Sequence, residues 1–452
     1  MVSFVAASAK SPRMILLSWL SLALFLAAAH AGEPLDRLRQ WPHWRGPLAT
    51  GAAPHGDPPT RWDEKTNVKW KAPLPGRGSA TPIIWGDCVF VTAAVDTGRV
   101  ASAEDLPKID DKLERKTEAP KTYHRFLLLC FDRNAGKLRW QRTCTERVPH
   151  EGIQQTHSYA AGSPMTDGKH IWVSFGSHGV YCYDFSGELK WKRMDLPRMH
   201  TRLGWGEAST PVVHEDALVL NWDQEIGSRL IVLDAATGRT RWQIDRDEPT
   251  TWHTPFIVRH DGVTQVITNG TNKMRGYDFK TQKLLWECGG GTINAIPSPV
   301  AADGVAFIMS GYGRSIAIAV PLDARGDLTG SEKLAWTQTR GTPYVPSPLL
   351  VDGKLYFTQA NSNLLTCLDA KTGQPNFERE RLEECSSFYG SPVAAAGRIY
   401  LTDRAGVTVV LKQAPKLEVL ATNRLDDRFD ASPAVVGRQM FLRGHEHLYC
   451  LE

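Results

Sequence analysis

A proline-led motif that returns at a nearly constant interval constrains this chain more than any other feature. A Ser/Thr/Ala-Pro pair opens a run of alternating apolar residues at Pro82, Pro164, Pro211, Pro255, Pro299, Pro348, Pro392 and Pro433. The successive intervals are 82, 47, 44, 44, 49, 44 and 41 residues, and the long first interval contains one insertion, near residues 96–124. A period in the forties is typical of the four-stranded blades of β-propellers. Eight opening motifs therefore predict eight blades.

The copy between Thr210 and Trp242 shows the internal order of the unit most clearly. Asp234 is suited to accept nearby backbone N–H groups, and Gly238 supplies the positive φ that closes a hairpin. We expect four short antiparallel strands in this copy: one after Pro211, then 217–221, 229–233 and one ending at Trp242.

An aromatic residue ends six of the copies, at Trp140, Trp191, Trp242, Trp286, Trp336 and Phe377. Large apolar side chains at one repeated position suit the wedge-shaped space between adjacent blades. We therefore interpret these aromatics as structural.

The last copy stops after its third strand, and the missing strand lies at the other end of the chain. Residues 67–71 carry the same closing tryptophan, Trp70, just before the first opening motif. A strand from the N-terminal side would complete the last blade and remove an exposed sheet edge. The prediction is an all-β, eight-bladed propeller over residues 67–452. Residues 32–66, which lack a period, are expected to form an extended arm anchored by Trp41 and Trp44.

The first 31 residues read as a signal peptide. Lys10 and Arg13 precede an apolar stretch, and Ala29-His30-Ala31 has the pattern of a cleavage site. We expect a periplasmic or secreted monomer that meets membranes only through its partners. Loss of the two cations lowers the formal net charge from +4 to +2, and this balance argues against a nucleic-acid partner.

Export makes disulfides possible for the eight cysteines. Cys130, Cys182, Cys367 and Cys450 occupy one repeat position, where a small apolar residue facing a sheet interior is the simpler interpretation. The pattern leaves the state of the other four open.

The Ser-Pro opening, the turn of the type Leu-Asp-Ala-x-Thr-Gly and the closing tryptophan resemble the pyrroloquinoline-quinone (PQQ) type of propeller repeat. Families with this repeat include quinoprotein alcohol and glucose dehydrogenases and the propeller lipoprotein of the outer-membrane β-barrel assembly machinery. The segments 41–47, 342–350 and 416–425 also resemble exported bacterial propellers of undefined role. Because one fold serves many functions, the resemblance selects none of these roles.

Two functions of different classes follow from the resemblance. A quinoprotein dehydrogenase needs a carboxylate base, calcium ligands and flat apolar surfaces around the quinone. This chain has neither the adjacent cysteines that such alcohol dehydrogenases imply nor a Cys-x-x-Cys-His haem motif. We therefore predict a non-enzymatic scaffold for protein or peptide partners, similar to the outer-membrane assembly factor. A PQQ- and calcium-dependent dehydrogenase of alcohols or sugars is the alternative, and carbohydrate binding is a third possibility.

One face of the propeller should hold the binding residues, because the loops before the first strand and between the second and third strands of each blade emerge together. This face is predicted to present His157, Tyr159, Trp205, Glu207, Trp252, His253, Asn294, Arg314, Tyr344, Tyr389 and Arg404. If the protein is an enzyme, Glu207, Asp223 and Asn269 are the candidates for base and metal ligands; otherwise they cap turns. We expect no metal at His445 and His447, which we interpret as part of a turn.

Overall fold

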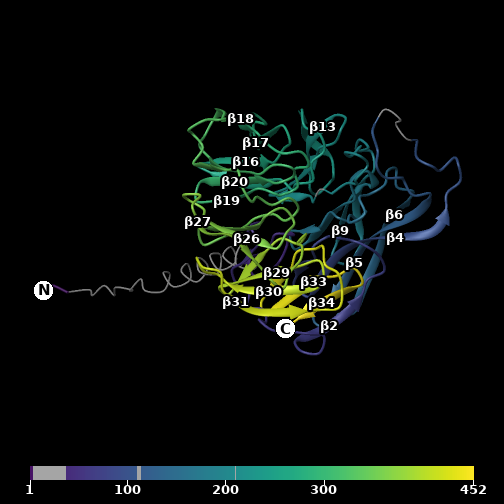
Figure 1. Ribbon diagram of the computed structural model, residues 1–452, viewed down its shortest axis with the longest axis horizontal. Coiled ribbons are helices and arrows are strands. Elements are labelled where there is room, and N and C mark those ends of the chain that lie inside the picture. Colours follow the sequence, from purple (N-terminus) through teal and green to yellow (C-terminus); the bar gives the residue numbers. More distant parts are fainter. Residues whose placement is uncertain (4–36, 109–112, 209) are drawn as a thin grey trace.

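The computed structural model describes residues 1–3, 37–108, 113–208 and 210–452. These residues form eight β-sheets arranged as the blades of a propeller (Figure 1). The expected all-β, eight-bladed fold is therefore confirmed. Most of the predicted signal peptide, residues 4–31, lies outside the described residues. No helix in the described part of the chain has the length and apolar character needed to cross a bilayer.

The first four blades follow one another along the chain, and within each the main strands pair in antiparallel order. Blade 1 has β3 (Ile83–Trp85), β4 (Cys88–Val100), β5 (Thr122–Asp132) and β6 (Leu138–Arg147). Blade 2 has β7 (Met165–Thr166), β8 (His170–Ser174), the 3-10 turn η1 (Gly176–His178), β9 (Val180–Asp184) and β10 (Leu189–Arg193). Blade 3 has β11 (Val212–His214), β12 (Ala217–Trp222), β13 (Ser228–Asp234) and β14 (Thr240–Arg246). Blade 4 has β15 (Phe256–His260), β16 (Val263–Thr268), β17 (Lys273–Asp278), β18 (Leu284–Gly289) and, in parallel, β22 (Gly326–Asp327).

The remaining blades repeat this plan, and two of them recruit strands from the N-terminal side. Blade 5 has β19 (Val300–Ala302), β20 (Val305–Ser310), β21 (Ile316–Pro321) and β23 (Trp336–Gln338). Blade 6 has β24 (Leu349–Val351), β25 (Lys354–Thr358), β26 (Leu364–Asp369) and β27 (Pro375–Arg381). Blade 7 has β28 (Val393–Ala395), β29 (Arg398–Thr402), β30 (Val407–Lys412), β31 (Val419–Arg424) and the added β1 (Ala52–Ala53). Blade 8 has β32 (Ala434–Val436), β33 (Gln439–Arg443), β34 (His447–Leu451) and β2 (Val68–Pro73).

The C-terminal strand β34 meets β2, from the N-terminal side of the propeller, in blade 8, where β2 is the outer strand (Figure 1). The pairing is antiparallel, with Trp70 opposite Cys450 and Lys71 opposite Tyr449. The prediction that an N-terminal strand completes the last blade is confirmed. Backbone groups of β34 that would otherwise form an open edge are thereby hydrogen-bonded.

The structure extends two elements beyond their predicted ends. The fourth strand of blade 3 was expected to end at Trp242, but β14 continues to Arg246 and pairs with β13 as far as Ser228. The insertion near residues 96–124 begins and ends as a ribbon that prolongs β4 and β5, with Asp96 opposite His124. In both places, the end of the strand is set by pairing with the neighbouring strand. The amino-acid composition does not reveal this pairing.

Four of the closing tryptophans attach their blade to the turn of the next one. The indole Nε1–H groups of Trp70, Trp140, Trp191 and Trp336 donate to backbone carbonyls of the next blade, at 2.9–3.0 Å. Each accepting residue directly follows the aspartate of a hairpin turn, at Arg133, Phe185, Ala235 and Ala370.

The glycine of each turn makes this close contact possible. Gly238 has a φ of +72°, and a Cβ added to it would lie 2.6 Å from the ring of Trp191. Asp234 accepts the Thr237 N–H at 2.9 Å, so the carboxylate orders the turn as expected. A side chain other than hydrogen at position 238 would therefore push the indole out of place.

The hydrophobic cores lie between blades. Each of the seven buried clusters combines residues of adjacent blades, and the cluster around Phe441 and Trp70 joins the last blades to the first. The other closing aromatics, Trp242, Trp286 and Phe377, each pack in such a cluster. Their predicted role as wedges between blades is confirmed.

The repeat-position cysteines also belong to these cores. Cys130, Cys182, Cys367 and Cys450 are fully buried, which confirms their interpretation as small core residues. Every cysteine of the chain lies in the described part of the structure and has a free thiol.

We expect deletion of residues 1–71 to cause aggregation, because the edge of β34 would then be exposed. Size-exclusion chromatography with light scattering, compared with a chain lacking only residues 1–31, measures this effect. A shortened protein that remained monomeric with an unchanged melting temperature would contradict the role of β2 in closure.

Replacing Trp191 with alanine should lower the free energy of unfolding by about 3–5 kcal/mol, because a buried indole between two blades is lost. Leu189→Ala, on the same strand but exposed, is the matched control and should change stability by less than about 0.5 kcal/mol. Urea unfolding of both variants provides the comparison. Equal losses in the two variants would show that Trp191 is not a wedge.

Candidate functional site

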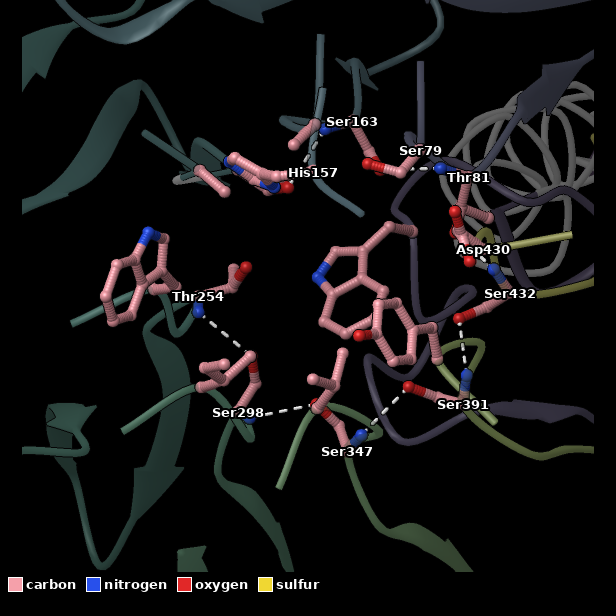
Figure 2. Close-up of a pocket in the computed structure, with 18 of the residues that line it drawn as sticks. Ser79, Thr81, His157, Ser163, Thr254, Ser298, Ser347, Ser391, Asp430 and Ser432 are labelled. Carbon is pink, nitrogen blue, oxygen red and sulfur yellow. Dashed lines mark hydrogen bonds between the residues drawn. The ribbon is translucent and has the colours of Figure 1, made fainter. Parts of the chain in front are cut away.

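A ring of hydroxyl side chains surrounds the propeller axis, and each blade contributes one member (Figure 2). In seven of the eight neighbouring pairs described, the backbone N–H of one member donates to the side-chain hydroxyl of the member on the next blade, at 2.9–3.2 Å. The last of these bonds, from Ser432 to Thr81, crosses the junction between blades 8 and 1. The members are Thr81, Ser163, Thr210, Thr254, Ser298, Ser347, Ser391 and Ser432.

The opening motif explains the ring. Every member directly precedes the proline that begins a copy of the repeat. A residue before proline is held in an extended conformation, and the proline itself has no N–H to satisfy. The backbone N–H of the Ser or Thr before the proline can therefore point sideways to the next blade. A hydroxyl is the smallest side chain that can accept such a bond.

The ring members line a cavity of about 440 Å³ on the propeller axis. Its wall combines these hydroxyl groups with aromatic side chains, and Tyr312 and Tyr344 pack against each other at a ring-centroid distance of 4.7 Å. Burial raises the pKa of Tyr344 to about 12, so its phenol is a hydrogen-bond donor at neutral pH. The other aromatic members of the wall are Trp44, Trp205, Trp252 and Tyr389.

The N-terminal arm contributes to this site from below. The buried guanidinium of Arg45 donates to the carbonyl oxygens of Pro348 and Pro392, at 2.8 and 2.9 Å, directly after two members of the hydroxyl ring. Trp44, the preceding residue, lines the cavity. Trp41 is fully buried and forms a β-bridge with Ile84 of blade 1. The arm is thereby attached to several blades at the axis.

Asp430 is the one carboxylate among the described residues that line the axial cavity, and it is already paired. Arg404 Nε lies 2.6 Å from one carboxylate oxygen and His445 Nε2 lies 2.8 Å from the other. Burial opposes the charge of Asp430, but these two hydrogen bonds prevail and lower its pKa. The Arg404 guanidinium also stacks on Tyr389, 4.0 Å from the ring centroid. The charge of Asp430 is therefore neutralised within the wall.

Five of the residues predicted for the binding face line the axial cavity: His157, Trp205, Trp252, Tyr344 and Tyr389. Arg404 lies behind Tyr389, as its stacking shows. Tyr159 and Glu207 line a second, smaller cavity. His253, Asn294 and Arg314 line neither of the two; the first two are buried, and Arg314 donates to the Gly291 carbonyl at 3.2 Å.

The structure does not bring the three candidate enzyme residues together. Asp223 forms a fully buried ion pair with Arg246, at 2.8 Å, and also accepts the Thr251 hydroxyl. The Asn269 amide donates to the carbonyls of Pro297 and Met309, both at 2.8 Å. Both side chains are therefore occupied in holding blades and loops together, while Glu207 lies elsewhere, in the second cavity.

The second cavity has a volume of about 20 Å³ and adjoins the first, with Ala161 and Ala208 lining both. His150, Glu151 and Glu207 each point one possible ligand atom toward it, and these atoms lie within 4.8 Å of one another. Glu151 accepts the Thr201 backbone N–H, and Glu207 accepts the Ser177 backbone N–H at 2.6 Å. The Nε2 of His150 lies 3.5 Å from Glu207 Oε1.

Burial dominates the protonation of this cluster. Loss of solvation raises the pKa of Glu207 to about 8 and that of Glu151 to about 7, and the two carboxylates also repel each other. Burial lowers the pKa of His150 to about 4. Arg115 and Arg198 favour the charged carboxylates, but burial outweighs their effect and raises both pKa values.

The two histidines near the C-terminus have carboxylate partners of their own. His445 lies in the turn before β34 and is paired with Asp430, whereas His447, the first residue of that strand, lies 3.5 Å from Asp427. Each imidazole faces a different carboxylate. The prediction of a turn is therefore correct for His445 but not for His447, which pairs with the neighbouring strand β2 as part of β34.

The axial cavity does not fit PQQ with calcium. The quinone carries three carboxylates, and no lysine or arginine is among the described residues that line the cavity. Calcium takes six to eight oxygen ligands, and the single carboxylate there, Asp430, is engaged by Arg404 and His445. The aromatic walls would suit a flat ring, but the charges of the cofactor would remain unpaired.

Several residues of the site were missed from the sequence. The hydroxyl ring was recognisable, because a Ser or Thr precedes the proline in all eight copies. Tyr312, Thr156 and the pair His150-Glu151 carry no periodic signal, since they lie in loops of unequal length between strands. Contacts across the axis, such as Thr156 Oγ1 with Tyr389 Oη at 3.0 Å, depend on the closed ring and not on local sequence.

Fold and site together define an eight-bladed propeller of the PQQ-like repeat class with an aromatic axial cavity. The chain belongs to the family described as "Outer membrane protein assembly factor BamB", whose model matches residues 125–379, more than half of the 452 residues. The comparison with curated proteins found no match.

Solved structures with a similar fold have little sequence in common with this chain. The quinohemoprotein alcohol dehydrogenase from Comamonas testosteroni has a TM-score of 0.60 and 11% identity, over 94% of this chain and 83% of that one. The computationally designed Ika8 protein has a TM-score of 0.51 and 11% identity, over 75% and 98%. BamB from Moraxella catarrhalis has a TM-score of 0.49 and 12% identity, over 80% and 98%. At these identities the likeness shows the fold alone.

We expect Ser347→Ala to lower the free energy of unfolding by about 1–3 kcal/mol, because the Ser298 N–H loses its acceptor inside the ring. Ser347→Thr keeps a hydroxyl and should recover most of the loss. Chemical denaturation of the three proteins measures the difference. If Thr and Ala variants were equally destabilised, the hydrogen bond would not be the cause.

Proposed function

We propose that this protein is an exported, non-enzymatic propeller that binds a protein or peptide partner, with a segment of the partner entering the axial cavity. The proposal places it in the periplasm or outside the cell as a monomer. The family description, which names an assembly factor of outer-membrane proteins, supports a role in holding other polypeptides. Contact with a membrane would then be made by the partner.

The observation that carries the proposal is the composition of the axial cavity. Its wall combines broad aromatic faces with hydroxyl groups and has one carboxylate, which is internally neutralised. Such a surface favours ligands that are uncharged, partly apolar and rich in hydrogen-bonding groups. A backbone segment with small or aromatic side chains has these properties. The volume of about 440 Å³ accommodates a few side chains and not a folded domain.

The rigidity of the site supports binding more than catalysis. His157, the imidazole in the wall, has a pKa lowered by burial and makes a hydrogen bond through Nε2 to the Glu207 carbonyl, at 3.1 Å. The lowered pKa weakens His157 as a proton acceptor, and its Nε2 is already engaged, so the side chain does not suit general-base catalysis. Trp252 is likewise fixed, since its indole N–H donates to the Gly206 carbonyl at 2.7 Å.

A photoreactive phenylalanine derivative in place of Tyr344 tests the proposal in cells that export the full chain. We expect ultraviolet light to link it to polypeptides, identified by mass spectrometry, because position 344 lies in the cavity wall. The same substitution at Ile226, which is exposed and outside the cavity, is the matched control and should yield at most a tenth as much adduct.

The linked polypeptides should also be lost when the wall is altered elsewhere. Combining the photoreactive residue with Trp252→Ala should reduce the yield severalfold, since an aromatic contact is removed. Equal yields at positions 344 and 226 would contradict a peptide site on the axis. Turnover of alcohols or sugars by the purified protein with added PQQ and calcium would instead favour the dehydrogenase.

A further inference from the structure

We propose that His150, Glu151 and Glu207 form a binding site for one divalent transition-metal ion, of the Zn²⁺ or Mn²⁺ class, in the small cavity beside the axis. This site is independent of the proposed function, because it uses none of the aromatic residues assigned to partner binding. The sequence indicated Glu207 as a possible metal ligand, but together with Asp223 and Asn269; His150 and Glu151 were not expected, because they come from a different interblade segment.

The geometry meets the needs of such an ion. The three potential ligand atoms lie within 4.8 Å of one another. Around a tetrahedral ion with bonds of about 2.0–2.2 Å, ligand atoms stand roughly 3.4 Å apart, so small side-chain movements complete the set. The cavity of about 20 Å³ has room for one particle of the size of a water molecule.

An unsatisfied atom points to a missing partner in this cavity. Among the described residues, none forms a hydrogen bond with the buried Oε1 of Glu207, and the Glu207 side chain is only 9% exposed. The other oxygen, Oε2, is fixed by the Ser177 N–H. A buried carboxylate oxygen with no partner is costly, and a bound cation would satisfy it.

The Glu207 carboxylate packs closely against the backbone of Gly176 in η1. A Cβ on Gly176 would collide with Glu207 Oε2, and Gly176 has a φ of +56°, which favours glycine. The carboxylate is therefore held against η1 with its second oxygen directed toward His150. This arrangement presents one oxygen for an ion.

The ligand set selects the class of ion. One imidazole with two carboxylates suits Zn²⁺ or Mn²⁺, whereas Ca²⁺ requires more oxygen atoms than this cavity offers. Binding through Nε2 of His150 requires the tautomer with the proton on Nδ1, so the proton that Nε2 now donates to the Met199 carbonyl, 2.7 Å away, moves to Nδ1 and the imidazole stays neutral. The carbonyl oxygen then becomes available as a fourth donor.

The ion would connect two segments that build the axial cavity. His150 and Glu151 precede blade 2 in the segment that also carries His157, and Glu207 precedes blade 3, two residues after Trp205. These segments already touch, since the Gln154 N–H donates to the Trp205 carbonyl at 3.0 Å. A shared ion would fix them more firmly and so hold the aromatic wall in place.

The test uses the full chain, stripped of metal with a chelator and titrated with Zn²⁺ by calorimetry. We expect one ion per chain, a higher melting temperature with Zn²⁺ and at least tenfold weaker binding of Ca²⁺. Glu207→Gln and Glu151→Gln should each weaken Zn²⁺ binding at least tenfold. His170→Ala, which removes a half-buried histidine 3.3 Å from Asp167 and outside the cavity, is the control and should leave the affinity unchanged.

Three outcomes would overturn the proposal: no saturable Zn²⁺ binding, unchanged affinity in both glutamine variants, or tighter binding of Ca²⁺. Substitution of Co²⁺ into the unaltered chain keeps the test decisive if a variant fails to fold. Its visible spectrum should show nitrogen and oxygen ligation, and thiolate charge-transfer bands would instead assign the ion to a cysteine. Partner crosslinking at Tyr344 in the same variants distinguishes failure of this site from failure of the proposed function.

Discussion

The structure depends on closure of the ring through the pairing of β2 with β34. Two repeated sets of hydrogen bonds run from one blade to the next and need a neighbour there. Four closing indoles donate to the following blade, and seven hydroxyl-ring members donate their backbone N–H to the next member. A gap would leave a sheet edge, an unfilled wedge and an unsatisfied N–H at the same junction. Blade 8 meets blade 1 through Trp70 and through Ser432, so the same junction carries all of these requirements.

The N-terminal arm breaks the symmetry that the repeats would otherwise give. Eight similar blades would produce an axis with eight similar sides, which offers a ligand no preferred orientation. Arg45 binds the carbonyls of blades 6 and 7 only, and Trp44 enters the cavity from this one segment. Because its guanidinium has carbonyl acceptors and no carboxylate, burial lowers the pKa of Arg45 to about 9. Its hydrogen bonds to the blades offset that desolvation, and the arm thereby makes the site directional.

The structural features that depend on repeated motifs were predictable from the sequence. The features that depend on residues outside the repeat were not. The period located the blades, the aspartate and glycine located the turns, and Trp70 located the closing strand, because each is required by local backbone geometry. The end of β14 was missed because Arg246 belongs to the strand through its pairing with Ser228 and its ion pair with Asp223. Asp223 and Asn269 looked available for chemistry because a sequence does not show which polar groups find buried partners. The His150-Glu151 pair was missed for the opposite reason, since its third member is Glu207, more than fifty residues away.

The irregular segments therefore carry the chemistry that the regular blades support. Hairpin turns and inner strands are fixed by contacts that recur in nearly every copy, so they leave few polar groups for other uses. The loops that enter blades 2 and 3 hold both the polar cluster around Glu207 and the aromatic ring of Trp205. Ala161 and Ala208 line both cavities and separate them with small side chains. The two sites also share a direct hydrogen bond, because the backbone carbonyl of Glu207 accepts from His157 in the wall of the axial cavity.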